Sequence, residues 1–356
     1  MSEVNRILAQ LVERNKTPSV QYVFFDKDST IEHCQLGYAD VSHQIPTTEQ
    51  TTYHAYSVTK TFTALAILQL AEQQKLEIEQ SARCYLPDFP YSPEITIKQL
   101  LTHSAGIPNP IPLNWIHLES EHTAFDRNAF FKKVFLQNSR LRSKPNDQFA
   151  YSNLGYVLLG QIIEQVSGLR YEDYVRTHIL APLKLKASEI EFAVAGASLH
   201  AKGYHKRTSF SYLLLGFLLD KRKYMAPAEG IWRPFKTFYV NGASYGGLIG
   251  TAQAFVRYLQ ELIKSNSVLI SDDYKKELFV ENHTNSGQRT GMCLAWFRGQ
   301  LQGHEYFAHA GGGGGYYCEL RIYPAKEMGS VLMMNRTGFK DERYLDNLDK
   351  FLIYMQ

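Results

Sequence analysis

The 356-residue sequence predicts a mixed α/β fold, in which one antiparallel sheet built from both ends of the chain is flanked by helices. Short β-rich runs separated by turns lie near both termini, whereas the long stretch between them carries helical patterns and loops. A chain of this length also suits two closely packed subdomains. We therefore expect an α/β subdomain from residues 1–85 and 242–356, and an inserted, mostly helical subdomain from residues 86–241.

The N-terminal part predicts a short helix followed by a β-hairpin. The helix covers residues 8–13, and the two strands cover residues 20–25 and 31–36. The polar sequence DKDS between the strands, residues 26–29, is typical of a turn. A helical pattern follows in HAYSVTKTFTALAILQLAEQQ, residues 54–74, so the hairpin precedes the first long helix.

The C-terminal part predicts the remaining strands. Four short β-rich runs cover residues 292–297, 304–308, 316–323 and 329–334, with turns between them. A helical pattern over residues 345–355 follows the last run. These runs are expected to complete the sheet that the N-terminal hairpin begins.

The composition favours small-molecule partners. With 44% hydrophobic and 21% charged residues, the chain resembles soluble globular proteins. Its 38 Lys and Arg residues against 35 Asp and Glu give a net charge of +3, which provides neither a nucleic-acid footprint nor a polybasic membrane patch. The sequence is silent on oligomeric state.

The termini, cysteines and histidines indicate a reduced, cytoplasmic protein without cofactors. Residues 1–21 are polar and helical in period, so we expect no secretory signal. The histidines are scattered and no HExxH occurs, so no metal is expected. The four cysteines show no CxxC pairing and no zinc-finger spacing. They are Cys34, Cys84, Cys293 and Cys318.

One apolar run, YLLLGFLL at residues 212–219, is flanked by the basic triplets HKR at 205–207 and KRK at 221–223. It is far shorter than the ~20 residues that a membrane-spanning helix needs. We therefore expect no transmembrane segment here, and interpret the run as a buried helix or a lid. A lipid-facing or acyl-chain-binding surface is the alternative.

Ser57 and Lys60 form the first candidate for chemistry. A hydroxyl is a poor nucleophile until a neighbour takes its proton, and a lysine one helical turn later projects from the same face. The N–H groups at a helix start can also stabilise an oxyanion. The alternative is that Ser57 caps the helix and Lys60 is a solvated surface charge.

The second candidate is the sequence Tyr151-Ser152-Asn153, which precedes a strongly apolar helical stretch. A phenol near a lysine can relay a proton, and an asparagine amide can orient a lysine or a carbonyl. A core tyrosine followed by a helix cap is the alternative. The sequence at residues 239–241 has the same spacing but leads into glycines.

The third candidate is His309-Ala310-Gly311-Gly312, at the end of a β-rich run. Glycines permit close approach of backbone to a ligand, and an N–H group here could serve as a second oxyanion donor. Neither GxGxxG before a helix nor a closing Lys-Ser/Thr is present, which argues against a phosphate loop. A flexible turn between strands is the alternative.

Taken together, SVTK at 57–60, YSN at 151–153 and HAG at 309–311 resemble the three active-site boxes of the serine β-lactamase and penicillin-binding-protein superfamily. The opening tyrosine of the second box is similar to the branch of class C β-lactamases, D-Ala-D-Ala carboxypeptidases and family VIII esterases. LLTHSAGIP at 100–108 and YGGLIGTAQAFVRYLQELI at 245–263 also look typical of this branch. The resemblance therefore implies a β-lactamase/transpeptidase-like fold, with the active site where the two subdomains meet.

The resemblance also implies roles for individual residues. Ser57 would be the acylated nucleophile, and Lys60 and Tyr151 would jointly handle its proton. Asn153 would orient the substrate and Lys60. The N–H groups of Ser57 and Gly312 would form the oxyanion hole.

His309 departs from the pattern of the β-lactamases, which usually carry a lysine there. With Gly311, it is expected to contact the substrate, but a histidine of pKa near 6.5 is mostly neutral at about pH 7. RTG at 289–291 and RTG at 336–338 lie outside the position that the family uses. Efficient β-lactam hydrolysis is therefore not expected.

The resulting hypothesis is a cytoplasmic serine hydrolase that acts on small acyl esters. A D-aminoacyl peptidase or amidase, or a weak β-lactamase, is the alternative within enzymes. A non-catalytic binding protein of the same fold is the alternative of another class.

Overall fold

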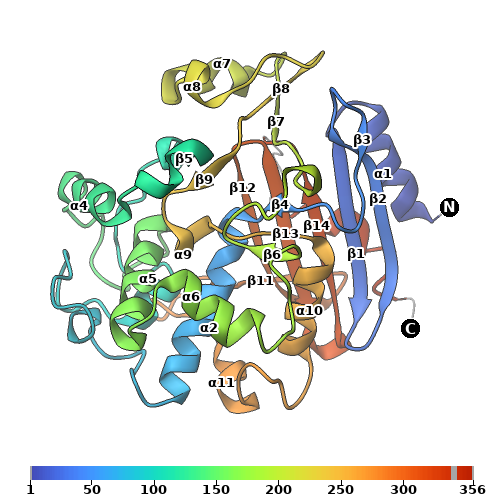
Figure 1. The fold of residues 1–356 in the computed structure, drawn as a ribbon. Coiled ribbons are helices and arrows are strands. Elements are labelled where there is room, and N and C mark those ends of the chain that lie inside the picture. Colours follow the sequence, from blue (N-terminus) through green and yellow to red (C-terminus); the bar gives the residue numbers. More distant parts are fainter. Residues whose placement is uncertain (1, 338–342, 355–356) are drawn as a thin grey trace.

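The structure, a computed structural model, describes residues 2–337 and 343–354. Within these residues, seven antiparallel strands form the main sheet, in the order β11-β12-β13-β14-β1-β2-β3 (Figure 1). The strands are β1 (Ser19–Asp26), β2 (Thr30–Asp40), β3 (Ile45–Pro46), β11 (Phe297–Leu301), β12 (His304–Gly313), β13 (Tyr316–Tyr323) and β14 (Met328–Met334). Because β1 pairs with β14, the two ends of the chain share one sheet, as predicted.

Each face of the sheet covers its own hydrophobic core. In β1, Val23 and Phe25 point into the larger core, which contains α2 (Thr59–Glu72). The alternate residues Tyr22 and Phe24 point into a smaller core beneath α1 (Glu3–Glu13). Successive side chains of a strand point to opposite faces, so a strand covered on both sides is apolar throughout.

Three long helices position the site. α2 is buried over almost its whole length, α5 (Asn153–Ser167) packs against it, and α10 (Ala252–Ile263) packs on β14 and β1 (Figure 1). The side-chain hydroxyl of Ser152 accepts the Gly155 N–H and caps α5.

The remaining elements are short. The other helices are α3 (Ile97–Leu101), α4 (Arg127–Gln137), α6 (Tyr171–Val175), α7 (Phe210–Leu218), α8 (Lys221–Tyr224), α9 (Ala243–Gly246), α11 (Asp272–Glu277) and α12 (Asp346–Asp349). In the minor sheets, β10 (Ile249–Gly250) pairs with both β4 (Tyr53–His54) and β6 (Ile190–Glu191), β5 (Ile116–Leu118) pairs with β9 (Phe238–Val240), and β7 (Tyr204–Lys206) pairs with β8 (Trp232–Pro234).

The N-terminal hairpin and the mixed fold are confirmed, but two predicted elements are wrong. Residues 292–297 form a turn that is closed by one bridge, with Ala295 at φ +67°, and β11 begins only at Phe297. The run is apolar because it is buried, not because it is extended. The helix expected over 345–355 shortens to α12, and turns follow to residue 354. Met355 lies outside the described residues.

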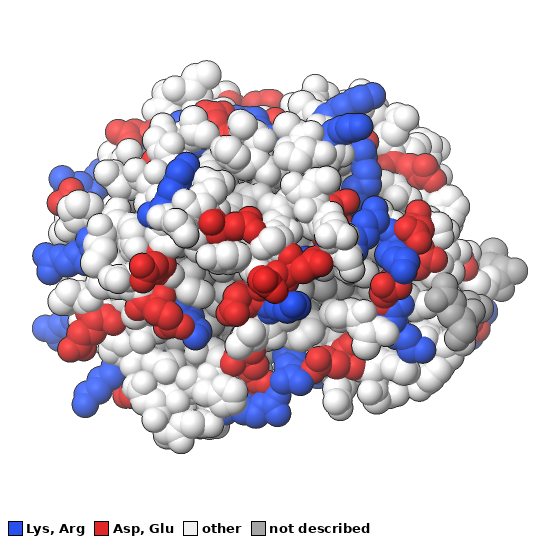
Figure 2. Space-filling model, turned by 90° about the horizontal axis from the view of Figure 1, so that it is seen from below, with Lys and Arg blue, Asp and Glu red and all other residues white. Residues whose placement is uncertain are grey.

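The predicted helix at residues 212–219 is confirmed as α7, although its large side chains are not all buried. No helix within the described ranges is long and apolar enough to cross a membrane. On the face seen from below, acidic and basic side chains are interspersed (Figure 2). The division into two subdomains at residues 85 and 242 stays a prediction.

A buried ionic cluster ties the C-terminal segment to the sheet. Arg321 on β13 is fully buried, and its guanidinium lies 2.9 Å from Glu319 and 4.0 Å from Asp349. The Asp349 carboxylate also accepts hydrogen bonds from Tyr22 and Tyr323. Burial raises the pKa of Glu319 to about 7, although Arg321 opposes this shift. The cluster depends on the cation at its centre.

Replacing Arg321 with methionine would leave Glu319 and Asp349 buried without their cation. Because an uncompensated buried charge is costly, we expect the free energy of unfolding to fall by about 3–5 kcal/mol, measured by urea denaturation. Lys27→Met is the control, since the Lys27–Glu327 pair lies on the surface. Equal losses in the two variants would contradict the proposed importance of the cluster.

Candidate active site

Four of the predicted site residues meet at one point. Ser57 lies in the 3-10 turn Tyr56–Val58, which leads directly into α2. Its Oγ lies 3.0 Å from Lys60 Nζ and 2.8 Å from Tyr151 Oη. Lys60 Nζ also lies 2.8 Å from Asn153 Oδ1. Two segments more than ninety residues apart in the sequence therefore converge on a single hydroxyl.

The geometry around Ser57 differs from that of a helix cap. The cap position of α2 is Val58, which makes no side-chain capping bond. Tyr56 has φ +47°, a left-handed conformation that is unfavourable for a tyrosine. Such strain costs on the order of 1–3 kcal/mol and persists where the surroundings hold it. Here the partly buried Tyr56 ring packs beside those of His54 and Tyr316.

Lys60 is fully buried rather than solvated. Besides Ser57 and Asn153, its Nζ donates to the backbone oxygen of Tyr245, 2.8 Å away. These three partners are uncharged, and the rings of three tyrosines lie 5.0–5.4 Å from the amine. Burial therefore lowers the pKa of Lys60 well below its usual 10.5, because the charged form loses its hydration.

His103 packs against Tyr151. It was not among the predicted site residues. Its ring packs against the Tyr151 ring at an angle of 31° with centroids 4.1 Å apart, and its Nδ1 accepts the Ser152 N–H at 3.1 Å. Burial and the nearby Lys60 lower the pKa of His103, so it is a neutral ring at pH 7. The signal in the sequence was its position in LLTHSAGIP, a segment that resembles the family.

The glycines of the third motif form part of strand β12 rather than a flexible turn. Gly311 and Gly312 pair with Cys318 and Tyr317 of β13. A Cβ on Gly311 would lie 2.6 Å from the Ser57 nitrogen, so only glycine allows the strand to pass this closely. Gly312 lines the cavity beside Ser57.

His309 lies beside Tyr151, with ring centroids 6.5 Å apart, and is only 1% exposed. Its Nδ1 is 2.5 Å from the Ala295 backbone oxygen. Burial is the main reason why the pKa of His309 falls to about 3, and the nearby Lys60 lowers this pKa further. At neutral pH the ring is therefore uncharged and offers no cation to a substrate carboxylate.

A cavity of about 350 Å³ opens at Ser57, within the range of small-molecule sites. Ser57, Asn153 and Gly312 provide its polar end. The walls are mainly apolar, and several of the wall residues come from the segment between residues 205 and 240. The apolar wall includes Leu113, Ile116, Leu215, Leu219, Phe235 and Val240.

The two RTG sequences, at residues 289–291 and 336–338, do not lie at the third motif. Arg289 forms an ion pair with Glu281 and is not among the residues that line the cavity at Ser57. Thr337 lines the cavity and accepts the Gly315 N–H, whereas Gly338 lies outside the described residues. Among the residues that the structure describes, no cluster of three His, Cys, Asp or Glu side chains could hold a metal ion.

The amino-acid sequence is similar to that of several known proteins. The Beta-lactamase family model matches residues 4–354. Penicillin-binding protein 4* of Bacillus subtilis is 26% identical over 304 residues, which cover 82% of this chain and 62% of that protein. Protein flp of Staphylococcus aureus is 30% identical over 191 residues, covering 52% of this chain and 37% of that protein. The chain therefore spans less than two thirds of either relative.

Solved structures give the same fold at low sequence identity. The octameric penicillin-binding protein homologue from Pyrococcus abyssi has a TM-score of 0.78 at 23% identity and covers 99% of this chain and 76% of that chain. A class C beta-lactamase has a TM-score of 0.74 at 18% identity, covering 99% and 95%. D-amino acid amidase from Ochrobactrum anthropi SV3 has a TM-score of 0.72 at 18% identity, covering 98% and 96%. The predicted β-lactamase/transpeptidase-like fold is confirmed, and the chain belongs to the beta-lactamase family.

Proposed function

We propose that the protein is a serine hydrolase that forms an acyl-enzyme on Ser57 and acts as an esterase on small acyl esters. The observation that carries the proposal is the position of the Ser57 hydroxyl. It lies between Lys60 Nζ at 3.0 Å and Tyr151 Oη at 2.8 Å, at the polar end of an apolar cavity. A nucleophile within hydrogen-bond reach of its proton acceptors is the arrangement that covalent catalysis requires.

In the proposed acylation step, Ser57 Oγ attacks the ester carbonyl and its proton passes to the Lys60–Tyr151 pair. A depressed pKa leaves Lys60 neutral for part of the time, so that it can accept this proton. The N–H groups of Ser57 and Gly312 would stabilise the oxyanion. When the carbonyl re-forms, the ester C–O bond breaks and the leaving alcohol takes the proton from the pair.

Deacylation would follow the same route with water. The pair removes a proton from a water molecule, and the resulting hydroxide attacks the acyl carbonyl. The bond to Ser57 Oγ then breaks, the serine regains its proton and the acid is released. Lys60 and Tyr151 are assigned this work jointly, because both atoms lie within reach of the same hydroxyl.

The cavity supports an apolar, uncharged acyl group. Its walls are lined by leucine, isoleucine, valine and phenylalanine side chains, and His309 is neutral at pH 7. A substrate carboxylate would find no cation at His309. These features favour simple acyl esters over penicillin-like substrates, whose carboxylate the family usually meets with a lysine.

A D-aminoacyl amidase or peptidase, or a weak β-lactamase, is the second candidate. It is favoured by the shared fold with D-amino acid amidase and by the penicillin-binding relatives. A non-catalytic binder is favoured less, because Ser57, Lys60 and Tyr151 are all present and in contact.

Intact-mass measurement with a fluorophosphonate tests the nucleophile. We expect one covalent adduct on the wild-type protein and none on Ser57→Ala, while the exposed-serine control Ser139→Ala reacts as the wild type does. Hydrolysis of p-nitrophenyl butyrate should follow the same pattern. If the wild-type protein neither forms the adduct nor hydrolyses the ester, the proposal that it is a serine hydrolase is refuted. Faster turnover of nitrocefin or of a D-Ala-D-Ala peptide would favour the second candidate.

The pH dependence of kcat/KM for the ester tests Lys60. Because burial lowers its pKa, Lys60 is neutral at a lower pH than a free lysine. We therefore expect kcat/KM to rise with pH to a plateau, with an apparent pKa well below 10.5. Lys60→Ala should lower the plateau by about 10²–10⁴-fold. Lys60→Arg keeps a cation that does not titrate and should be equally inactive. An apparent pKa near 10.5 would contradict a buried base.

A further inference from the structure

Helix α7 carries large apolar side chains on the outside of the molecule. It lies with α8 at the top of Figure 1, at the end of the β7–β8 ribbon. Its nine residues, FSYLLLGFL, include no charged side chain. Phe210 is 74% exposed and Leu213 is 64% exposed. Exposed apolar clusters of this kind mark interaction surfaces more often than scattered single residues do.

The helix presents apolar side chains in two directions. Leu215, and Leu219 directly after the end of the helix, are buried and line the cavity beside Ser57. Phe210 and Leu213 lie on the opposite side of the helix, as the rotation of about 100° per residue requires. The inward leucines form part of the cavity wall. The outward pair has no role in the proposed hydrolysis.

The charges around α7 are strongly biased toward the basic side. Residues 205–236 contain seven Lys or Arg residues and two Asp or Glu residues, while the whole chain has a net charge of only +3. Both acids are already engaged. Asp220 accepts the N–H groups of Arg222 and Lys223 at the start of α8, and Glu229 pairs with Lys202. The remainder of the chain is therefore net acidic, and the positive charge concentrates beside the apolar helix.

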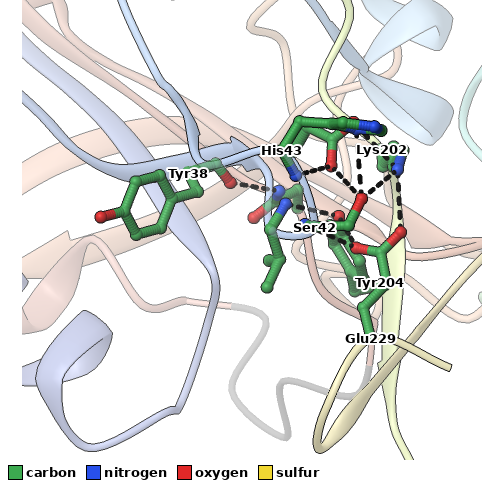
Figure 3. Close-up of polar contacts among 9 residues, drawn as sticks. Tyr38, Ser42, His43, Lys202, Tyr204 and Glu229 are labelled. Carbon is green, nitrogen blue, oxygen red and sulfur yellow. Dashed lines mark hydrogen bonds and ion pairs between the residues drawn. The ribbon is translucent and has the colours of Figure 1, made fainter.

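The base of this segment is fixed to the main sheet. Lys202 Nζ lies 2.9 Å from Asp40 and 2.8 Å from Glu229 (Figure 3). Tyr204 Oη donates to Glu229 and accepts the Val41 N–H. Asp40 ends strand β2, so the network joins the α7 segment to the end of this strand of the main sheet. These contacts anchor the two ends of the segment that carries α7 to the main sheet.

We infer that α7, together with the basic residues that flank it, is a docking surface for an anionic lipid surface. Apolar side chains enter the boundary between headgroups and acyl chains, while lysine and arginine side chains meet the lipid phosphates. A second copy of the chain fits less well, because two such segments would bring like charges together. Docking goes beyond the proposed hydrolysis and does not require it.

Flotation with lipid vesicles tests the surface. We expect the protein to bind vesicles of equimolar phosphatidylcholine and phosphatidylglycerol, and to bind pure phosphatidylcholine vesicles much less. The double variants Phe210→Ser/Leu213→Ser and Arg207→Gln/Arg222→Gln should each weaken binding about tenfold or more. Binding should also fall at about 1 M salt, where the Debye length is only about 3 Å.

Matched controls come from α4, which also has exposed apolar and basic side chains. Leu136→Ser and Lys132→Gln/Lys133→Gln should leave vesicle binding unchanged. None of the four substituted α7-segment residues lines the cavity, so turnover of a soluble ester should stay unchanged in these variants. Vesicle binding by Ser57→Ala separates this inference from the proposed function.

Three outcomes would overturn the inference. These are no binding to anionic vesicles, equal loss in the α4 controls, and concentration-dependent dimerisation that Phe210→Ser/Leu213→Ser abolishes while vesicle binding persists.

Discussion

The amine of Lys60 lies in the interior of the protein with three uncharged oxygen neighbours, and the rest of the site depends on this placement. The Tyr245 carbonyl and the Asn153 amide fix the amine, so that it faces the Ser57 hydroxyl. Removing water from an ammonium group is expensive, and the group responds by giving up its proton more easily. The same burial that would destabilise a structural lysine therefore prepares this one to accept a proton.

The large sheet sets the position of the other side of the site. β12 can pass Ser57 closely because Gly311 has no Cβ, and the pairing of β12 with β13 keeps the strand in register. The two cores press on opposite faces of the sheet, which leaves little freedom for β12 to move away. The cavity is thus rigid at its polar end, and part of its apolar wall comes from the α7 segment.

The sequence predicted the features that have a local pattern. The hairpin, the strand at 316–323 and the three motifs each carry their signal within a few neighbouring residues. The turn at 292–297 was missed because burial on all sides produces the same apolar run as a strand does. The contact of Lys60 with the Tyr245 carbonyl has no sequence signature, because every residue has a backbone oxygen. The outward direction of Phe210 likewise depends on tertiary packing.

The pairing of β1 with β14 has a consequence for the order of events during synthesis. A ribosome releases the N-terminal hairpin and Ser57 early, but β12, β13 and β14 emerge only after about 300 residues. Until then, one edge of β1 has no partner, and an apolar strand with an open edge is prone to pair with other chains. The proposed nucleophile is therefore made long before its surroundings, and the nascent chain depends on late closure of the sheet to complete the site and to avoid aggregation.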